Sequence, residues 1–132
     1  MHFKFQLVRR TDLEAFRRQV LAYVASDPRT MFLVSGRLRD SIVFCEDAAE
    51  ARENLAKYQE YDVLDGWVGR AAISEDGIVF YQDCVEESRE AMRRFLKWAL
   101  RTAPPDRVVD LETREDLTAI AMTNPDGMFD AL

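Results

Sequence analysis

Four short runs of β-forming residues in this chain are each followed by a pair of residues that can cap a helix. Each pair has a Thr or Asp and an acid three positions later: Thr11 with Glu14, Asp47 with Glu50, Asp83 with Glu86, and Thr113 with Asp116. A Thr or Asp side chain can accept a hydrogen bond from a free amide of the first helical turn, and the acid complements the positive helix end. The pattern therefore predicts a strand followed by a capped helix at four places.

The segments between the caps add two predicted hairpins. Residues 31–35 and 41–46 are β-rich runs joined by a loop of hairpin length. Asp76-Gly77 predicts a tight turn between residues 67–74 and 78–82, in which Ile73 lies opposite Phe80. With strands at residues 3–8 and 107–111, the predicted order is βα-ββα-ββα-βα. We therefore predict an α+β fold with a mainly antiparallel or mixed sheet of about six strands and three main helices packed on it.

Apolar spacing places the three main helices at about residues 12–25, after Asp47, and at 86–102, and a short fourth helix at 114–122. On the third helix, the residues predicted to face the core are Val85, Met92, Phe95, Leu96 and Ala99. A chain of 132 residues is long enough for one domain with one core. We assign residues 1–122 to a single α+β domain and residues 123–132 to a C-terminal tail, which either folds back on the domain or frays, or serves as a docking peptide for a second subunit.

Composition restricts the partners and the compartment. The formal net charge is −6 and the isoelectric point is about 4.8. These values argue against binding to nucleic acid or anionic lipid, which requires clustered cations, and favour a partner protein with a basic surface. We expect no secretory leader and no membrane span, and two cysteines fit a reducing compartment. The predicted localisation is cytoplasmic.

Residues suited to catalysis are scarce. The only histidine is His2, and neither Cys45 nor Cys84 has a histidine nearby in the sequence. Cys84 follows the predicted cap Asp83, and a helix N-terminus lowers a thiol pKa, but the adjacent carboxylates oppose ionisation. No cysteine and histidine spacing fits zinc, and no acidic loop fits calcium. We predict no catalytic residue, metal or cofactor, and the chain reads more as a binding protein than as an enzyme.

The strongest binding signal in the sequence is a mixture of aromatic and acidic residues at a helix end and the following turn. The predicted partner-binding residues are Tyr58, Tyr61, Asp62, Asp65 and Trp67. Tyrosine and tryptophan are enriched in protein interfaces, and acids attract a basic partner. An equally simple interpretation is that Tyr58 and Trp67 belong to the core and that Tyr61 covers them.

A different candidate site follows from small residues in a predicted strand. Gly69 to Ala72 leave room under a helix, and such residues mark the close approach of a ligand or of another backbone. Arg70 lies in this strand, and Arg17 lies at the edge of the buried stripe of the first helix. Arg17 either lays its stem on the core with its head in water, or pairs with an acid in a pocket. The alternative ligand-binding residues are therefore Arg17, Gly69 and Arg70.

The predicted third helix also has a basic face, formed by Arg93, Arg94, Lys97 and Arg101. Arg94 and Trp98 are spaced i, i+4, which favours a cation–π contact with Trp98 partly exposed. With few aromatic residues between the cations, this face is a weak nucleic-acid signal.

Three functions remain open from the sequence. The first is a non-enzymatic protein-binding module, such as an inhibitor or an immunity-type protein that neutralises a basic partner. The second is a small-ligand-binding protein or enzyme with a pocket near Gly69 to Ala72. The third is a homodimeric structural subunit that associates through a sheet edge or the tail. We favour the first, because acid–base and metal chemistry are poorly provided for.

Overall fold

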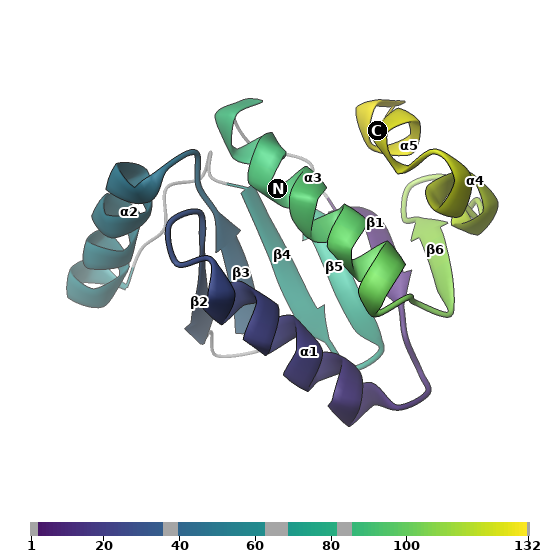
Figure 1. Cartoon of the computed structure of the whole chain (residues 1–132), viewed down its shortest axis with the longest axis horizontal. Helices are drawn as coiled ribbons and strands as arrows, with labels where there is room; N and C mark the ends of the chain where they lie inside the picture. The colour runs from purple at the N-terminus through teal and green to yellow at the C-terminus, as the bar shows by residue number, and fades with distance from the viewer. Residues whose placement is uncertain (1–2, 36–39, 63–68, 82–85, 132) are drawn as a thin grey trace.

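A computed structural model describes residues 3–35, 40–62, 69–81 and 86–131 (Figure 1). The strands in this part of the chain are β1 (Phe3–Val8), β2 (Met31–Ser35), β3 (Asp40–Phe44), β4 (Gly69–Ser74), β5 (Gly77–Tyr81) and β6 (Arg107–Asp110). The helices are α1 (Leu13–Ser26), α2 (Ala48–Tyr61), α3 (Glu86–Thr102), α4 (Thr118–Thr123) and α5 (Pro125–Ala131).

The strands form one sheet in the order β2-β3-β4-β5-β1-β6, and every neighbouring pair is antiparallel. The two predicted hairpins, β2–β3 and β4–β5, lie next to each other. The N-terminal strand then separates β5 from β6. The predicted α+β fold and its antiparallel sheet are confirmed, with five helices in the described residues where three main helices and a short fourth were expected.

Helices α1 and α3 cross one face of the sheet, and the main core lies under them (Figure 1). Phe95 of α3 is fully buried at its centre. The centroid of its ring lies 5.7 Å from that of Phe44 and 5.9 Å from that of Phe80, which in turn stacks on Phe5 at 4.5 Å. Burial of each such ring contributes roughly 2–3 kcal/mol, so these contacts help to hold α3 on the sheet. The predicted inward face of α3 is confirmed for Met92, Phe95, Leu96 and Ala99, which are all buried, and Val85 lies outside the described residues.

Helix α2 contributes to a second, smaller cluster. Its Ala51 and Tyr58 pack with alternate residues of β2 and β3, including Val34 and Val43. These strand residues point away from the main core, because successive side chains of a strand face opposite sides. Helix α2 therefore packs on the other face of the sheet from α1 and α3, and Figure 1 shows it beyond β2.

Two predicted caps differ in their outcome. At Asp47 the cap is confirmed, because its Oδ1 accepts from the Glu50 amide at 2.9 Å, and the Glu50 carboxylate accepts from the Glu46 amide at 3.1 Å. The predicted Thr11 cap is wrong. Helix α1 begins after Asp12, which has a left-handed backbone with φ of 49° and makes no side-chain cap, and the Thr11 hydroxyl donates to Asp106 at 3.3 Å. The predicted cap at Asp83 lies outside the described residues.

The β4–β5 turn lies one residue earlier than predicted, which shifts the pairing register by two residues. Ser74 pairs with Gly77 and Ile73 pairs with Ile78, so Glu75 and Asp76 form the turn. Gly77 begins β5 with φ of 137°, and a Cβ there would lie 1.8 Å from the Leu7 carbonyl oxygen. The close approach of β1 thus places glycine at the first strand position, and the predicted pairing of Ile73 with Phe80 is wrong.

The predicted helix over residues 114–122 starts too early. Arg114 has φ of 67°, and α4 begins only at Thr118, whose amide donates to the Asp116 carboxylate at 2.9 Å. The preceding residues run along the outer edge of β6, where the Leu117 amide donates to the Val108 carbonyl at 2.7 Å. Covering an edge strand in this way satisfies its free backbone groups, which explains why these residues are not helical.

Candidate functional site

The described part of the predicted partner-binding segment forms the end of α2. Tyr58 is half-buried against the second cluster, and its hydroxyl donates to the Ser35 carbonyl at 3.0 Å. Tyr61, in the last turn, is 66% exposed. Asp62 follows with φ of 55°, and its amide donates to the Tyr58 carbonyl at 2.8 Å, which ends the helix. Asp65 and Trp67 lie outside the described residues.

The surface around Tyr61 is acidic. Glu60 and Asp62 flank it, both are exposed, and neither forms an ion pair with another described residue. The last turn of α2 contains no basic residue, so nothing there offsets the negative end of the helix dipole. Tyr61 thus stands between two carboxylates, those of Glu60 and Asp62, that have no ion-pair partner among the described residues, and we call these three residues the acidic α2 end.

The three residues of the alternative ligand site are not brought together. Gly69 lies under α3, where a Cβ would be 3.0 Å from Met92 Cε, so the small residue accommodates the helix. Arg70 is on the opposite face of β4, with its guanidinium 5.5 Å from the centroid of the Tyr81 ring. Arg17 reaches the other end of β4, where its Nη2 donates to the Ser74 carbonyl at 3.0 Å.

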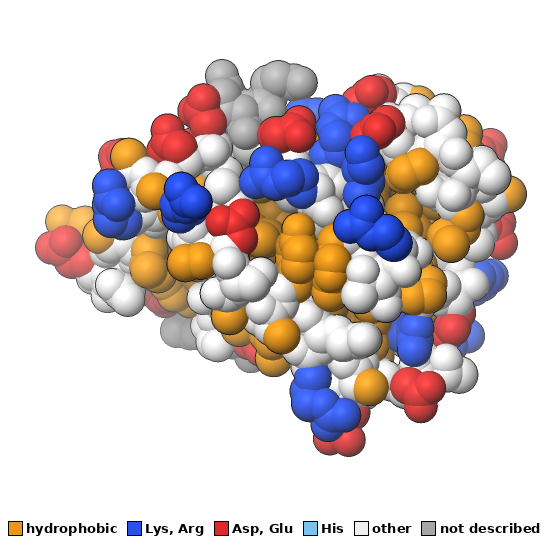
Figure 2. Space-filling model, in the orientation of Figure 1, with side chains coloured by type: hydrophobic (Ala, Val, Ile, Leu, Met, Phe, Trp, Pro, Cys, Tyr) orange, Lys and Arg blue, Asp and Glu red, His pale blue; other side chains and the backbone are white. Residues whose placement is uncertain are grey.

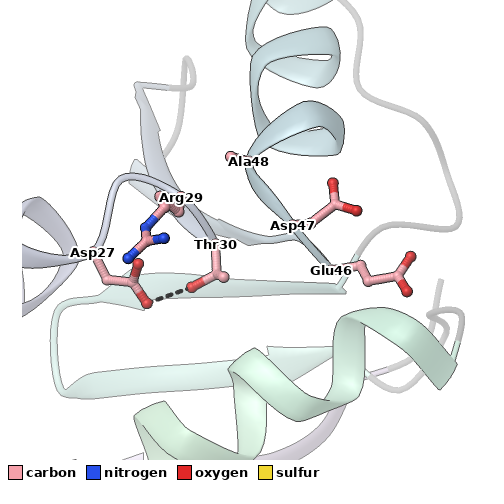
Figure 3. A pocket seen from close by; sticks show the side chains of 6 residues that line it. All are labelled: Asp27, Arg29, Thr30, Glu46, Asp47 and Ala48. Atoms are coloured by element: carbon pink, nitrogen blue, oxygen red, sulfur yellow. Dashed lines mark hydrogen bonds between the residues drawn. The ribbon is translucent and has the colours of Figure 1, made fainter.

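A shallow groove of about 470 Å³ lies between the α1–β2 connection and the start of α2 (Figure 3). It is lined by Asp27, Arg29, Thr30, Glu46, Asp47 and Ala48. Two of its carboxylates are already used, since Asp27 accepts from the Thr30 hydroxyl at 2.6 Å and Asp47 caps α2. In Figure 3 the Glu46 and Asp47 side chains point away from Arg29. The groove does not direct its charges to one point.

Cys45 is unsuited to nucleophilic catalysis. It is buried, and burial, with the nearby carboxylates of Glu50 and Asp47, raises the pKa of its thiol to about 12. Such a thiol is protonated at neutral pH and is a poor nucleophile. The described residues contain no group of three or more metal-binding side chains. His2 and Cys84 lie outside the described residues.

Sequence reasoning missed how α5 docks on α3. Arg93 contacts two acids of α5, Asp130 at 2.7 Å and Asp126 at 3.3 Å, and Lys97 contacts Asp126 at 3.2 Å. The Arg93 guanidinium also lies over the Phe129 ring, 4.9 Å from its centroid. The i, i+4 spacing of Arg93 with Lys97, matched by that of Asp126 with Asp130, is the sequence signal that could have indicated this contact.

The predicted contact between Arg94 and Trp98 is not formed. The Trp98 ring stacks on Tyr23 of α1, with 4.3 Å between centroids and an angle of 17° between planes. Arg94 instead donates to the Thr30 hydroxyl at 3.2 Å and lies 3.8 Å from the Asp27 carboxylate. An aromatic ring on the neighbouring helix thus replaces the cation, a contact that i, i+4 spacing cannot reveal.

No helix in the described ranges combines the length and apolar character needed to cross a membrane.

Comparison with known proteins provides no further assignment. No family model, curated protein or solved structure matches this chain.

Proposed function

We propose that this chain is a non-enzymatic protein-binding module whose acidic α2 end recognises a basic surface on a partner protein. An inhibitor or an immunity-type protein that neutralises a basic enzyme in the cytoplasm is the kind of protein that fits this description. The observation that carries the proposal is the 66% exposure of Tyr61 between two carboxylates that have no ion-pair partner among the described residues.

The physical argument concerns the roles of the two residue types. A tyrosine offers a large contact area and loses little conformational entropy when it is buried, so it can anchor an interface. The carboxylates speed association with a cationic partner and disfavour acidic ones. The Tyr58 hydrogen bond to Ser35 fixes the last turns of α2 to the sheet, so the anchor is held in place before binding.

Affinity purification of the tagged chain from its native host, at low and at moderate salt, tests the proposal. Wild type should retain a stoichiometric protein partner, identified by mass spectrometry, and Tyr61→Ala should weaken its binding by about thirtyfold, as is typical of an interface anchor. Asp62→Asn should slow association most at low salt, because the lost charge acts at long range. Asparagine tolerates the left-handed backbone at this position, so the helix end is preserved.

Met122→Ala is the matched control, because Met122 is a large exposed side chain on α4, 52% exposed and in a separate helix. It should leave binding unchanged. A partner that is lost equally in Met122→Ala and Tyr61→Ala, or a chain that retains no protein at either salt concentration, would contradict the proposal.

A further inference from the structure

One side of α3 already binds an acidic segment that contains an aromatic residue. The cations on this α5-facing side are Arg89, Arg93 and Lys97. The Phe129 ring lies against two of them, with guanidinium carbons 4.6 Å and 4.9 Å from its centroid. Asp126 and Asp130 complete the contact through ion pairs at 2.7–3.3 Å. In this contact, an aromatic ring flanked by carboxylates packs on a row of cations.

The adjoining flank of α3 presents a similar pattern to solvent. Arg94, Trp98 and Arg101 are spaced i, i+4, i+7 on this α1-facing side, and Trp98 is only partly buried in its stack on Tyr23. Figure 2 shows hydrophobic side chains in the middle of this face with Lys and Arg side chains nearby. Burial raises the pKa of Tyr23, the Arg94 and Arg101 cations oppose that rise, and the Asp27 carboxylate adds to it, so one acid and two cations lie near the aromatic pair.

The cations of the α1-facing side are paired with fewer carboxylates than Arg93 and Lys97 of the α5-facing side. Arg94 has one carboxylate, Asp27, at 3.8 Å, and its side chain is 47% exposed. Arg101 is exposed and pairs with no acid among the described residues. This side therefore has an aromatic surface and cationic charge available to an acidic segment.

The acidic α2 end has the complementary pattern on the same chain. Tyr61 is exposed between Glu60 and Asp62, as Phe129 lies among the acids of α5. Figure 1 places α2 beyond β2, at the other end of the sheet from α5, so the two patterns lie on different parts of one molecule.

We propose that the acidic α2 end of one copy docks on the α1-facing side of α3 in a second copy of this chain. Tyr61 then lies on the Tyr23–Trp98 pair, and its flanking carboxylates lie beside Arg94 and Arg101. This inference rests on the proposed function, because it names a partner for the same surface. The charge and aromatic complementarity of the two surfaces, and the α5 contact as an intramolecular example, favour a second copy as the occupant.

The two surfaces differ, so the contact is heterologous, and the dimer keeps one free surface of each kind, one on each copy. Association should therefore proceed beyond the dimer as concentration rises. Because the contact depends on exposed charges, it should weaken as added salt shortens the screening length from about 20–30 Å to a few Å.

Sedimentation equilibrium of the purified full chain tests this arrangement. Wild type at low salt should show an average mass that rises with concentration above the monomer mass of 15.3 kDa, and high salt should restore the monomer. Arg101→Gln, and the triple variant Glu60→Gln, Tyr61→Ala, Asp62→Asn, should each raise the dissociation constant by about tenfold or more. Arg52→Gln, which removes an exposed arginine elsewhere on α2, should behave as wild type.

Mixing the two defective variants gives the sharpest result. One retains the acidic α2 end and the other retains the α1-facing side, so together they should form a dimer that cannot grow further. The proposal is overturned if wild type is monomeric at low salt, if Arg101→Gln associates like wild type, or if the mixed variants do not combine. In those cases, capture of a foreign basic protein that depends on Tyr61 would still support the proposed function. Circular dichroism should show that each variant is folded.

Discussion

Alanine at Gly77 should destabilise this fold much more than the same substitution at Gly69. Gly77 begins β5 with φ of +137°, a backbone conformation that residues other than glycine rarely adopt. An added Cβ would lie 1.8 Å from the Leu7 carbonyl oxygen and 2.9 Å from its carbonyl carbon. Both are backbone atoms, so relief requires β1 to move away from β5.

The expected cost follows from two contributions. An alanine held in this backbone region costs about 1–3 kcal/mol. Moving β1 at this end disturbs the pairing of Gly77 with Val8 and the hydrogen bond from the Arg9 amide to the Asp76 carbonyl, which is 2.8 Å long. About two such bonds, at about 1 kcal/mol each, bring the expected loss to about 4 kcal/mol.

Gly69→Ala makes the same chemical change without these penalties. Its added Cβ would lie 3.0 Å from Met92 Cε, the end of a flexible side chain, and 3.2 Å from Ser88 Cβ. Methionine can adjust its rotamer, so the expected cost is about 1 kcal/mol.

Urea unfolding followed by far-UV circular dichroism measures the free energies of unfolding of wild type and both variants. A loss of under about 1 kcal/mol in Gly77→Ala, or a larger loss in Gly69→Ala than in Gly77→Ala, would refute the reasoning. Equal m-values are required for the comparison, since a change in m would mean that the denatured or native state had altered.

Two further predictions concern α5 and the buried thiol. Arg93→Gln should make the amides of α5 exchange with solvent about fivefold faster, as expected for the loss of a small ion-pair network, while the amides of α1 stay unchanged. Hydrogen bonds from Lys97 and, to a smaller extent, from Arg93 lower the pKa of the Asp126 carboxyl below 3.8. The ionised carboxylate therefore stabilises the folded chain fully above pH 3.8, and this contribution is lost as the pH falls through the lowered pKa of the folded state. The effect of Arg93→Gln should therefore diminish below pH 3.8, and an effect that persists in full would contradict it. Cys45, with a thiol pKa of about 12, should react with iodoacetamide at pH 8 at least about a hundredfold more slowly than after unfolding in urea. Mass spectrometry identifies the labelled cysteine, and rapid labelling of Cys45 in the folded chain would show that the thiol is not buried as described.

Local hydrogen bonding and periodicity explain the features that the sequence predicted correctly. The Asp47 cap joins groups three residues apart, so it needs no tertiary contact. The inward face of α3 follows from helical spacing alone, because Met92, Phe95, Leu96 and Ala99 share one stripe. The antiparallel pairing of β2 with β3 and of β4 with β5 follows from the short hairpin loops, which cannot join parallel strands.

For the binding surface, the sequence indicated the aromatic and acidic character of the α2 end but not which of its tyrosines is exposed. Tyr58 and Tyr61 have the same chemistry and are three residues apart. Tyr58 faces the sheet and its hydroxyl donates to the Ser35 carbonyl, whereas the Tyr61 side chain is 66% exposed. Only the position of α2 on the sheet separates their roles.

Long-range contacts decided the remaining features. The units that contain Ile42-Val43-Phe44 and Ile78-Val79-Phe80 look alike in sequence, yet α2 and α3 pack on opposite faces of the sheet. Thr11 has the chemistry of a cap, but its hydroxyl bonds to Asp106, 95 residues away. The turn before β5 is set by the approach of the Leu7 carbonyl from β1. The sequence determined which local structures can form, and tertiary structure chose among them, because the competing partners come from distant parts of the chain.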